Sequence, residues 1–223
     1  MTQTDYNESA VASSLYALLA NHNPKGNFDG LNQELSAIMF NDQTGFLDRS
    51  KQIDEWVAAH PQQEELGDML FDLLMVQFLA IETHEPDYFD SQEWNDIENK
   101  TLDKGSEMLN LFLYLSEAKE TEVEISLEDF LNEFLLVGED EFQDEYRIYE
   151  SLIVNDDLLD ADIESIRLVQ ADIKPETGLA DYFVPLVCFF QYAEGTAEQE
   201  QLETELIPFE KAVLQSMIAF LEN

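Results

Sequence analysis

The stretch QQEELGDMLFDLLMVQFLAIET, residues 62–83, is strongly apolar and decides the predicted fold. Its apolar side chains recur three or four residues apart, the spacing that places them on one face of an α-helix. They are Leu66, Met69, Leu70, Leu73, Leu74, Phe78 and Ile81. Met75, Val76, Leu79 and Ala80 widen this face until little of the helix is left for water. We therefore expect a central helix that is buried on nearly all sides.

Segments on both sides of this stretch show the same helical spacing. They cover residues 8–21, 28–40, 48–59, 87–117, 126–137, 142–153, 159–173, 178–193 and 208–221. Gly105 predicts a break within the fourth of these segments. Ser126 predicts a helix cap, and Pro208 suits the first turn of the last helix.

The pattern predicts an all-α fold of about ten helices, stacked as antiparallel helical hairpins. A weak similarity between residues 113–130 and 190–209 suggests that the stack could be solenoid-like. No linker rich in Pro, Gly or Ser divides the chain, so we expect a single acidic all-α domain over residues 1–223.

The net charge limits the kinds of partner that this chain can bind. It carries 49 acidic residues against 10 Lys and Arg, which gives a formal net charge of -39 at pH 7. A hydrophobic content of 45% is too high for a disordered acidic chain, so the charge must sit on a folded body. Direct binding to nucleic acid or to an anionic membrane is disfavoured, and a basic protein would be attracted from a distance.

Acidic residues are densest between Glu117 and Glu164, where only Lys119 and Arg147 oppose them. Carboxylates three or four residues apart on a helix lie about 5–6 Å from one another, a separation that could imitate a row of phosphates. Tyr146 and Tyr149 could act as aromatic anchors within this surface. The predicted partner-binding residues are Glu139, Asp140, Glu141, Asp144, Glu145, Tyr146, Tyr149, Asp156, Asp157, Asp160 and Asp162.

The preferred interpretation is a non-enzymatic acidic protein that neutralises a basic protein partner. It would act as an inhibitor, in the way that bacterial immunity proteins neutralise basic nuclease toxins, or as a nucleic-acid mimic. A different alternative is a helical-repeat scaffold whose acidic surface serves only solubility.

One short motif supports an enzymatic alternative. The residues Glu64-Glu65-Leu66-Gly67-Asp68, followed by Met69-Leu70-Phe71, resemble one helix of the MazG-like all-α nucleotide pyrophosphatases. The resemblance implies that Glu65 and Asp68, with Glu64 and Asp72, hold Mg²⁺ against a nucleotide triphosphate. That family also has an earlier Glu-x-x-Glu helix, and this chain has no such pair upstream.

The remaining signals point away from catalysis, so we expect no catalytic residue and no cofactor. His22, His60 and His84 lack the paired spacing of a metal site, and Cys188 lies in an apolar run that predicts a buried, inert thiol. The chain starts without the features of a signal peptide, and no apolar run reaches the ~20 residues that span a bilayer. We therefore expect a cytoplasmic protein.

Overall fold

The computed structural model describes residues 3–23, 26–79, 83, 88–131, 156–173 and 178–223. Every regular element in these ranges is a helix, which confirms the all-α prediction. The first half contains α1 (Gln3–His22), α2 (Phe28–Met39), α3 (Phe46–Ala59), the 3₁₀-helix η1 (Pro61–Leu66), α4 (Gly67–Gln77), η3 (Tyr88–Asp90), α5 (Gln92–Thr101) and α6 (Met108–Thr121). The second half contains α7 (Leu127–Phe130), η5 (Asp156–Asp160), α9 (Ile163–Gln170), η6 (Ala180–Tyr182), α10 (Phe183–Ala193), α11 (Gln199–Glu203) and α12 (Pro208–Leu221).

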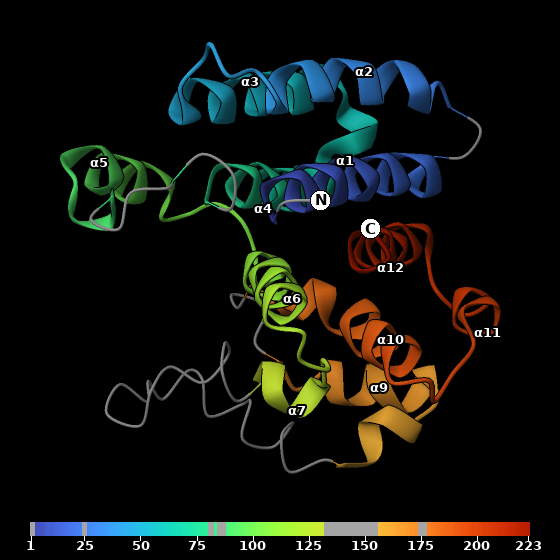
Figure 1. The fold of residues 1–223 in the computed structure, drawn as a ribbon. Helices are drawn as coiled ribbons and strands as arrows, with labels where there is room; N and C mark the ends of the chain where they lie inside the picture. Colours follow the sequence, from blue (N-terminus) through green and yellow to red (C-terminus); the bar gives the residue numbers. More distant parts are fainter. Residues whose placement is uncertain (1–2, 24–25, 80–82, 84–87, 132–155, 174–177) are drawn as a thin grey trace.

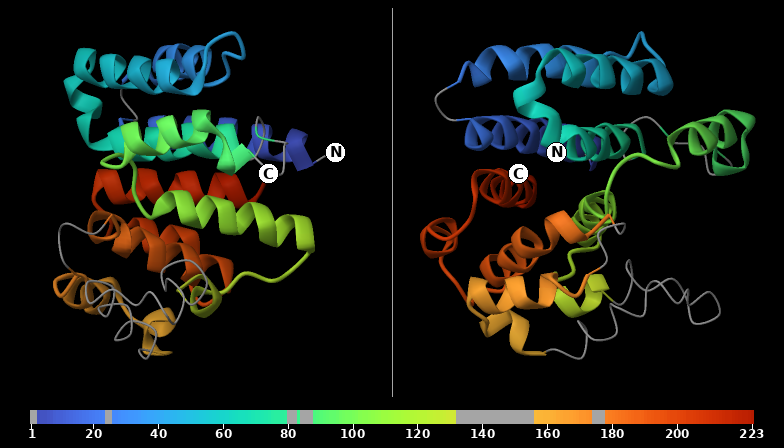
Figure 2. Two further views of the ribbon diagram at one scale, coloured as in Figure 1. Left: turned by 90° about the vertical axis from the view of Figure 1, so that its left-hand side faces the viewer. Right: turned by 180° about the vertical axis from the view of Figure 1, so that it is seen from behind.

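The helices are stacked in layers (Figures 1 and 2). The α2–α3 hairpin forms an outer layer over α1 and α4, α12 and α6 lie beneath these, and α10 packs between α12 and α9. The first and last helices, α1 and α12, run along each other. A stack built only from neighbours in the sequence would not bring these two together, so a solenoid-like order is not confirmed.

The contact between α1 and α12 is close because it contains small side chains. The hydroxyl oxygens of Ser14 and Ser216 lie 2.6 Å apart, and the Ser216 hydroxyl also donates to the Ser14 carbonyl oxygen at 3.1 Å. At the other end of α1, the Tyr6 hydroxyl donates to the carbonyl oxygen of Phe220. Both Ser side chains are fully buried, so these hydrogen bonds satisfy polar groups inside the core.

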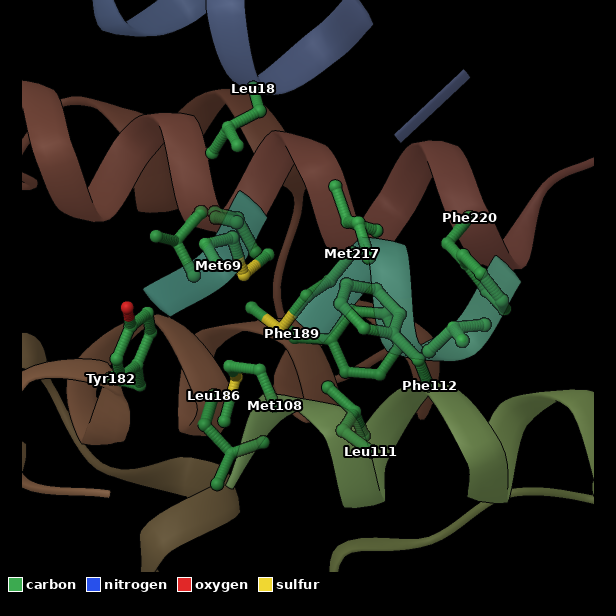
Figure 3. Packing of buried hydrophobic residues seen from close by; sticks show 14 of the residues in the cluster. Leu18, Met69, Met108, Leu111, Phe112, Tyr182, Leu186, Phe189, Met217 and Phe220 are labelled. Atoms are coloured by element: carbon green, nitrogen blue, oxygen red, sulfur yellow. The ribbon is translucent and has the colours of Figure 1, made fainter. Parts of the chain in front are cut away.

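The core lies where α1, α4, α6, α10 and α12 meet. Figure 3 shows buried side chains from these helices pointing toward one another, including Leu18, Met69, Phe112, Phe189 and Met217. The central stretch is buried as its pattern predicts, since every residue from Met69 to Phe78 is buried. Cys188 is also buried, and its surroundings raise the pKa of its thiol to about 12, chiefly through burial and then through the charge of Glu210.

The structure corrects the prediction of one continuous helix over residues 62–83. Pro61 begins a 3₁₀-helix that reaches Leu66, and the α-helix starts only at Gly67; after Gln77 a π-helical turn covers residues 78–79, and residues 80–82 lie outside the described part. In a 3₁₀-helix, residues three apart lie directly above each other, so Gln63 and Leu66 both point inward. Helix α11 was not predicted because its five residues are too few to show a period.

Local signals set several helix ends. The Ser126 hydroxyl accepts from the Asp129 N–H at 3.1 Å, and Pro208 occupies the first turn of α12, both as predicted. Pro185 lies in the first turn of α10, where its missing N–H would have no acceptor within the helix.

The rest of the helices expected over 126–137 and 142–153 lies outside the described residues. Among the described helices, none is both long and apolar enough to cross a bilayer.

Candidate functional site

The loop between α5 and α6 holds two carboxylates of α4 in place. The Gly105 N–H donates to Asp68 in the first turn of α4. One residue later, the Ser106 N–H donates to Asp72 at 3.0 Å and the Ser106 hydroxyl donates to the same carboxyl at 2.6 Å. Because Asp68 and Asp72 are one helical turn apart, consecutive loop residues can bind both of them.

Glycine is required at position 105 by both its backbone and its surroundings. Its φ of +83° lies in the left-handed region that side-chain-bearing residues rarely adopt. A Cβ atom at this position would stand 2.4 Å from Oδ1 of Asp72 and 3.0 Å from the ring of Phe71. The loop can therefore approach α4 this closely only because residue 105 has no side chain.

Asp72 is an acid enclosed by protein on all sides. Its side chain is fully buried, and burial raises the pKa of its carboxyl well above the ordinary range although the hydrogen bonds from Ser106 oppose the shift. The charges of Asp68 and Glu107 raise the pKa further. Tyr182 of η6, also buried, is in hydrogen-bond contact with Ser106, and its pKa is raised by burial and by the charges of Asp72 and Asp68.

Three hollows of the described surface meet at Asp68, with volumes of about 460, 420 and 430 Å³. We call them together the acidic cleft. Besides Asp68, its walls carry seven carboxylates: Asp54, Glu64, Glu65, Asp103, Glu107, Asp181 and Glu210. Partial burial, followed by the charge of Asp181, raises the pKa of the Asp68 carboxyl. Because burial is the larger cause, the Asp68 carboxylate is costly to ionise unless a cation comes close to it.

The cations that border the acidic cleft among the described residues already have acidic partners. Lys104 Nζ lies 2.5 Å from Asp54 and above the ring of Phe71. Arg167 of α9 binds the buried Glu210 through both terminal nitrogens, at 2.5 and 2.6 Å. In each pair the cation balances the charge of one cleft carboxylate. It is therefore not available to the other carboxylates of the cleft.

A backbone contact fixes one side of the cleft to the other. The Glu107 N–H, just before α6, donates to the Gly178 carbonyl oxygen at 3.1 Å, two residues before η6 begins. A Cβ atom on Gly178 would stand only 3.1 Å from Ser106 Cα, so a small residue is needed there. Burial raises the pKa of Glu107, whose carboxylate accepts from Asn110. This contact places Asp181 across from α4.

The four carboxylates of the predicted magnesium site point in different directions. Glu64, Glu65 and Asp68 line the acidic cleft, Glu65 also lies 2.5 Å from Nε2 of His22, and Asp72 faces inward to Ser106. Within the described ranges, no three His, Cys, Asp or Glu side chains are grouped closely enough to share a metal ion. The magnesium site stays a prediction.

Most of the predicted partner-binding residues lie outside the described ranges. These are Glu139, Asp140, Glu141, Asp144, Glu145, Tyr146 and Tyr149. Asp156 and Asp157 begin η5, and Asp160 at its end is exposed. Asp162 caps α9, since its Oδ1 accepts from the Ser165 N–H at 2.8 Å, and hydrogen bonds from Ser165 lower its pKa. A role for these residues in binding a partner stays a prediction.

Several residues of the acidic cleft had no signal in the sequence. Ser106, Glu107, Asp181 and Tyr182 belong to no motif, and they meet α4 only because the chain folds back on itself. The break at Gly105 was visible, and a glycine between two helical segments could have marked the loop as a place of close approach.

We compared the chain with protein-family models, curated proteins and solved structures, and none of them matches it.

Proposed function

We propose that this protein is a non-enzymatic, acidic, all-α binding protein that captures a basic protein partner in the cytoplasm and blocks that partner's function. The acidic cleft around Asp68 would receive the partner's cationic side chains. Inhibition of a basic enzyme or toxin and imitation of nucleic acid are two forms of the same recognition, because both present ordered carboxylates to a cationic surface.

The observation that carries this proposal is the imbalance of charge in the acidic cleft. Eight carboxylates line its three hollows, and the bordering Lys104 and Arg167 are paired with Asp54 and Glu210. Carboxylates in partly desolvated places gain free energy when a cation arrives. An incoming Lys or Arg would therefore be stabilised most strongly there.

The charge of the whole chain supports the same function. A net charge of -39 attracts basic proteins over long distances and accelerates their association at low salt. The position of Asp68 at the start of buried α4 adds preorganisation, because the loop residue Gly105 already interacts with its carboxyl.

The proposal is tested by isolating the tagged protein from its own cells at low salt and eluting bound proteins with a salt gradient. We expect a basic protein to elute, and the purified pair to associate more slowly as salt increases. The decisive variant is Glu64→Gln/Asp68→Asn/Asp181→Asn, which removes three charges from the cleft. Binding of the purified partner should weaken at least tenfold, or about 1.4 kcal/mol.

The matched control is Glu117→Gln/Glu120→Gln/Glu200→Gln, which removes three exposed charges away from the acidic cleft. Equal losses for both triple variants would mean that only net charge matters, as for a surface that serves solubility. Binding with little salt dependence would favour the scaffold alternative. Release of pyrophosphate from nucleotides with Mg²⁺, lost in an Asp68→Ala variant, would overturn the proposal in favour of an enzyme.

A further inference from the structure

Helix α5 and the preceding η3 project from the side of the helical stack (Figure 1 and the right view of Figure 2). The inner face of α5 is anchored by Ile97, which is buried in the core. The outer part carries Phe89, whose side chain is 54% exposed, and Trp94, which is half-buried. A large aromatic side chain that is left in water on a projecting element is typical of a binding surface.

The two aromatic side chains are held by a chain of ring contacts that begins in the core. The rings of Phe78 and Tyr88 meet edge to face at 5.7 Å, and Tyr88 contacts Trp94 at 6.3 Å. Phe89 and Trp94 then meet at 5.1 Å with their planes at 87°. We call Phe89 and Trp94 the aromatic ledge. Because neighbouring rings restrict its side chains, a partner that binds the ledge loses little conformational entropy.

Each ring of the aromatic ledge has an acidic neighbour in the chain. Asp90 directly follows Phe89, and Glu93 and Asp96 of α5 are three residues apart, so they share a helix face. All three side chains are exposed. The Ser91 hydroxyl caps α5 by accepting from the Trp94 N–H at 3.0 Å, which fixes the ledge relative to the first turn. Exposed carboxylates therefore adjoin both rings, Asp90 next to Phe89 and Glu93 next to Trp94, whereas Asp96 lies further around α5 from Trp94.

We propose that the aromatic ledge is the docking site for an arginine-rich segment of the basic partner. This inference rests on the proposed function and adds a second contact, distinct from the acidic cleft. Charge complementarity identifies the occupant, since Asp90, Glu93 and Asp96 would repel an acidic or anionic one. Arginine suits this surface better than lysine because its planar guanidinium stacks on an aromatic ring and binds a carboxylate through two N–H groups at once.

The experiment uses the full-length protein, with an octa-arginine peptide as the probe and an octa-lysine peptide as the comparison. The chain has two tryptophans, so a Trp56→Phe variant leaves Trp94 as the only reporter. Binding is followed by Trp94 fluorescence at about 0.15 M salt, where long-range attraction is largely screened. We expect a saturable change with octa-arginine, and binding of octa-lysine that is weaker by roughly fivefold or more.

Two matched pairs of variants in this background locate the contact. Phe89→Ala should weaken octa-arginine binding roughly tenfold, whereas Leu168→Ala, which removes another exposed apolar side chain, from α9, should leave it unchanged. Likewise, Asp90→Asn/Glu93→Gln should weaken binding, and Glu117→Gln/Glu120→Gln should do so much less. Urea unfolding of each variant verifies that the fold is retained.

The outcomes separate this inference from the proposed function. If the α5 variants bind octa-arginine as well as the unaltered reporter while the cleft variant Glu64→Gln/Asp68→Asn/Asp181→Asn does not, the ledge is excluded and the proposed function stands. If octa-lysine binds as tightly as octa-arginine, the preference for arginine is wrong. If neither peptide binds even the unaltered protein, the inference fails, whereas the proposed function is decided by the isolation of a basic partner in the salt gradient.

Discussion

Asp72 is costly to ionise in the folded protein. It is fully buried, and Asp68, Glu107 and Tyr182 are the titratable groups that act on it or respond to its charge. Because its folded-state pKa is raised, the folded protein binds this proton more tightly than the unfolded chain does. The stability linked to Asp72 is therefore fully present below the ordinary carboxyl pKa. It is lost as the pH rises toward the raised value.

We predict that an Asp72→Asn variant will lose less stability than the unaltered protein between mildly acidic and neutral pH. The amide is uncharged at every pH and can still accept from the Ser106 N–H. Urea unfolding across this pH range measures the effect, and each unit of pKa difference corresponds to about 1.4 kcal/mol. Parallel pH profiles for the two proteins would show that Asp72 ionises normally, contrary to the prediction.

Gly105 gives a second prediction at this scale. A Gly105→Ala variant combines an unfavourable positive φ with a clash against Asp72, so we expect it to destabilise the fold by roughly 3 kcal/mol or more. Gly195 has a similar φ of +75°, but a Cβ atom there would meet nothing within 4 Å, so Gly195→Ala measures the backbone cost alone. That cost should be about 1–2 kcal/mol. Thermal unfolding of the two variants compares these losses, and equal losses would mean that the loop moves away from α4 without penalty.

At the scale of helices, the ends that depend on a nearby side chain were predictable, and those that depend on the rest of the fold were not. Ser126 and Pro208 act on residues within one turn, so their signals are complete in the sequence. The change from 3₁₀- to α-helix at Gly67 depends on what Gln63 and Leu66 pack against. The acidic cleft is harder still to predict, because it needs the loop at Ser106 and the 3₁₀-helix η6 to reach α4 together.

Asp162 allows a prediction that separates the stability of α9 from partner binding. Asp162→Asn keeps an N-cap residue and removes the charge, whereas Asp162→Ala removes both. We expect the alanine variant to unfold at a temperature lower by roughly 2–4 °C and the asparagine variant to change much less. If Asp162 also binds the partner, both variants should weaken binding equally in a titration. Weaker binding by the alanine variant alone would assign Asp162 a purely structural role.

Charge dominates at the scale of the whole molecule. The folded chain must hold its 49 acidic residues closer together than the unfolded chain does, and their repulsion lowers its stability. Increasing the ionic strength from about 0.01 to about 0.15 M shortens the screening length from roughly 30 to 8 Å.

We therefore predict that added NaCl raises the melting temperature by several degrees at neutral pH, measured by scanning calorimetry. The control is the same salt series at a pH near the isoelectric point, where most carboxylates are protonated and the effect should nearly vanish. A salt response of equal size at both pH values would mean that ion-specific effects, rather than carboxylate repulsion, limit the stability.

The pairing of α1 with α12 has a consequence for how the protein is made in the cell. A ribosome makes α1 long before α12, the helix that covers much of its apolar stripe. Until α12 has been made, Leu15 and its apolar neighbours are covered only in part, by α2 and α4. Premature release of the nascent chain before α12 would leave this stripe uncovered and open to chaperones or aggregation.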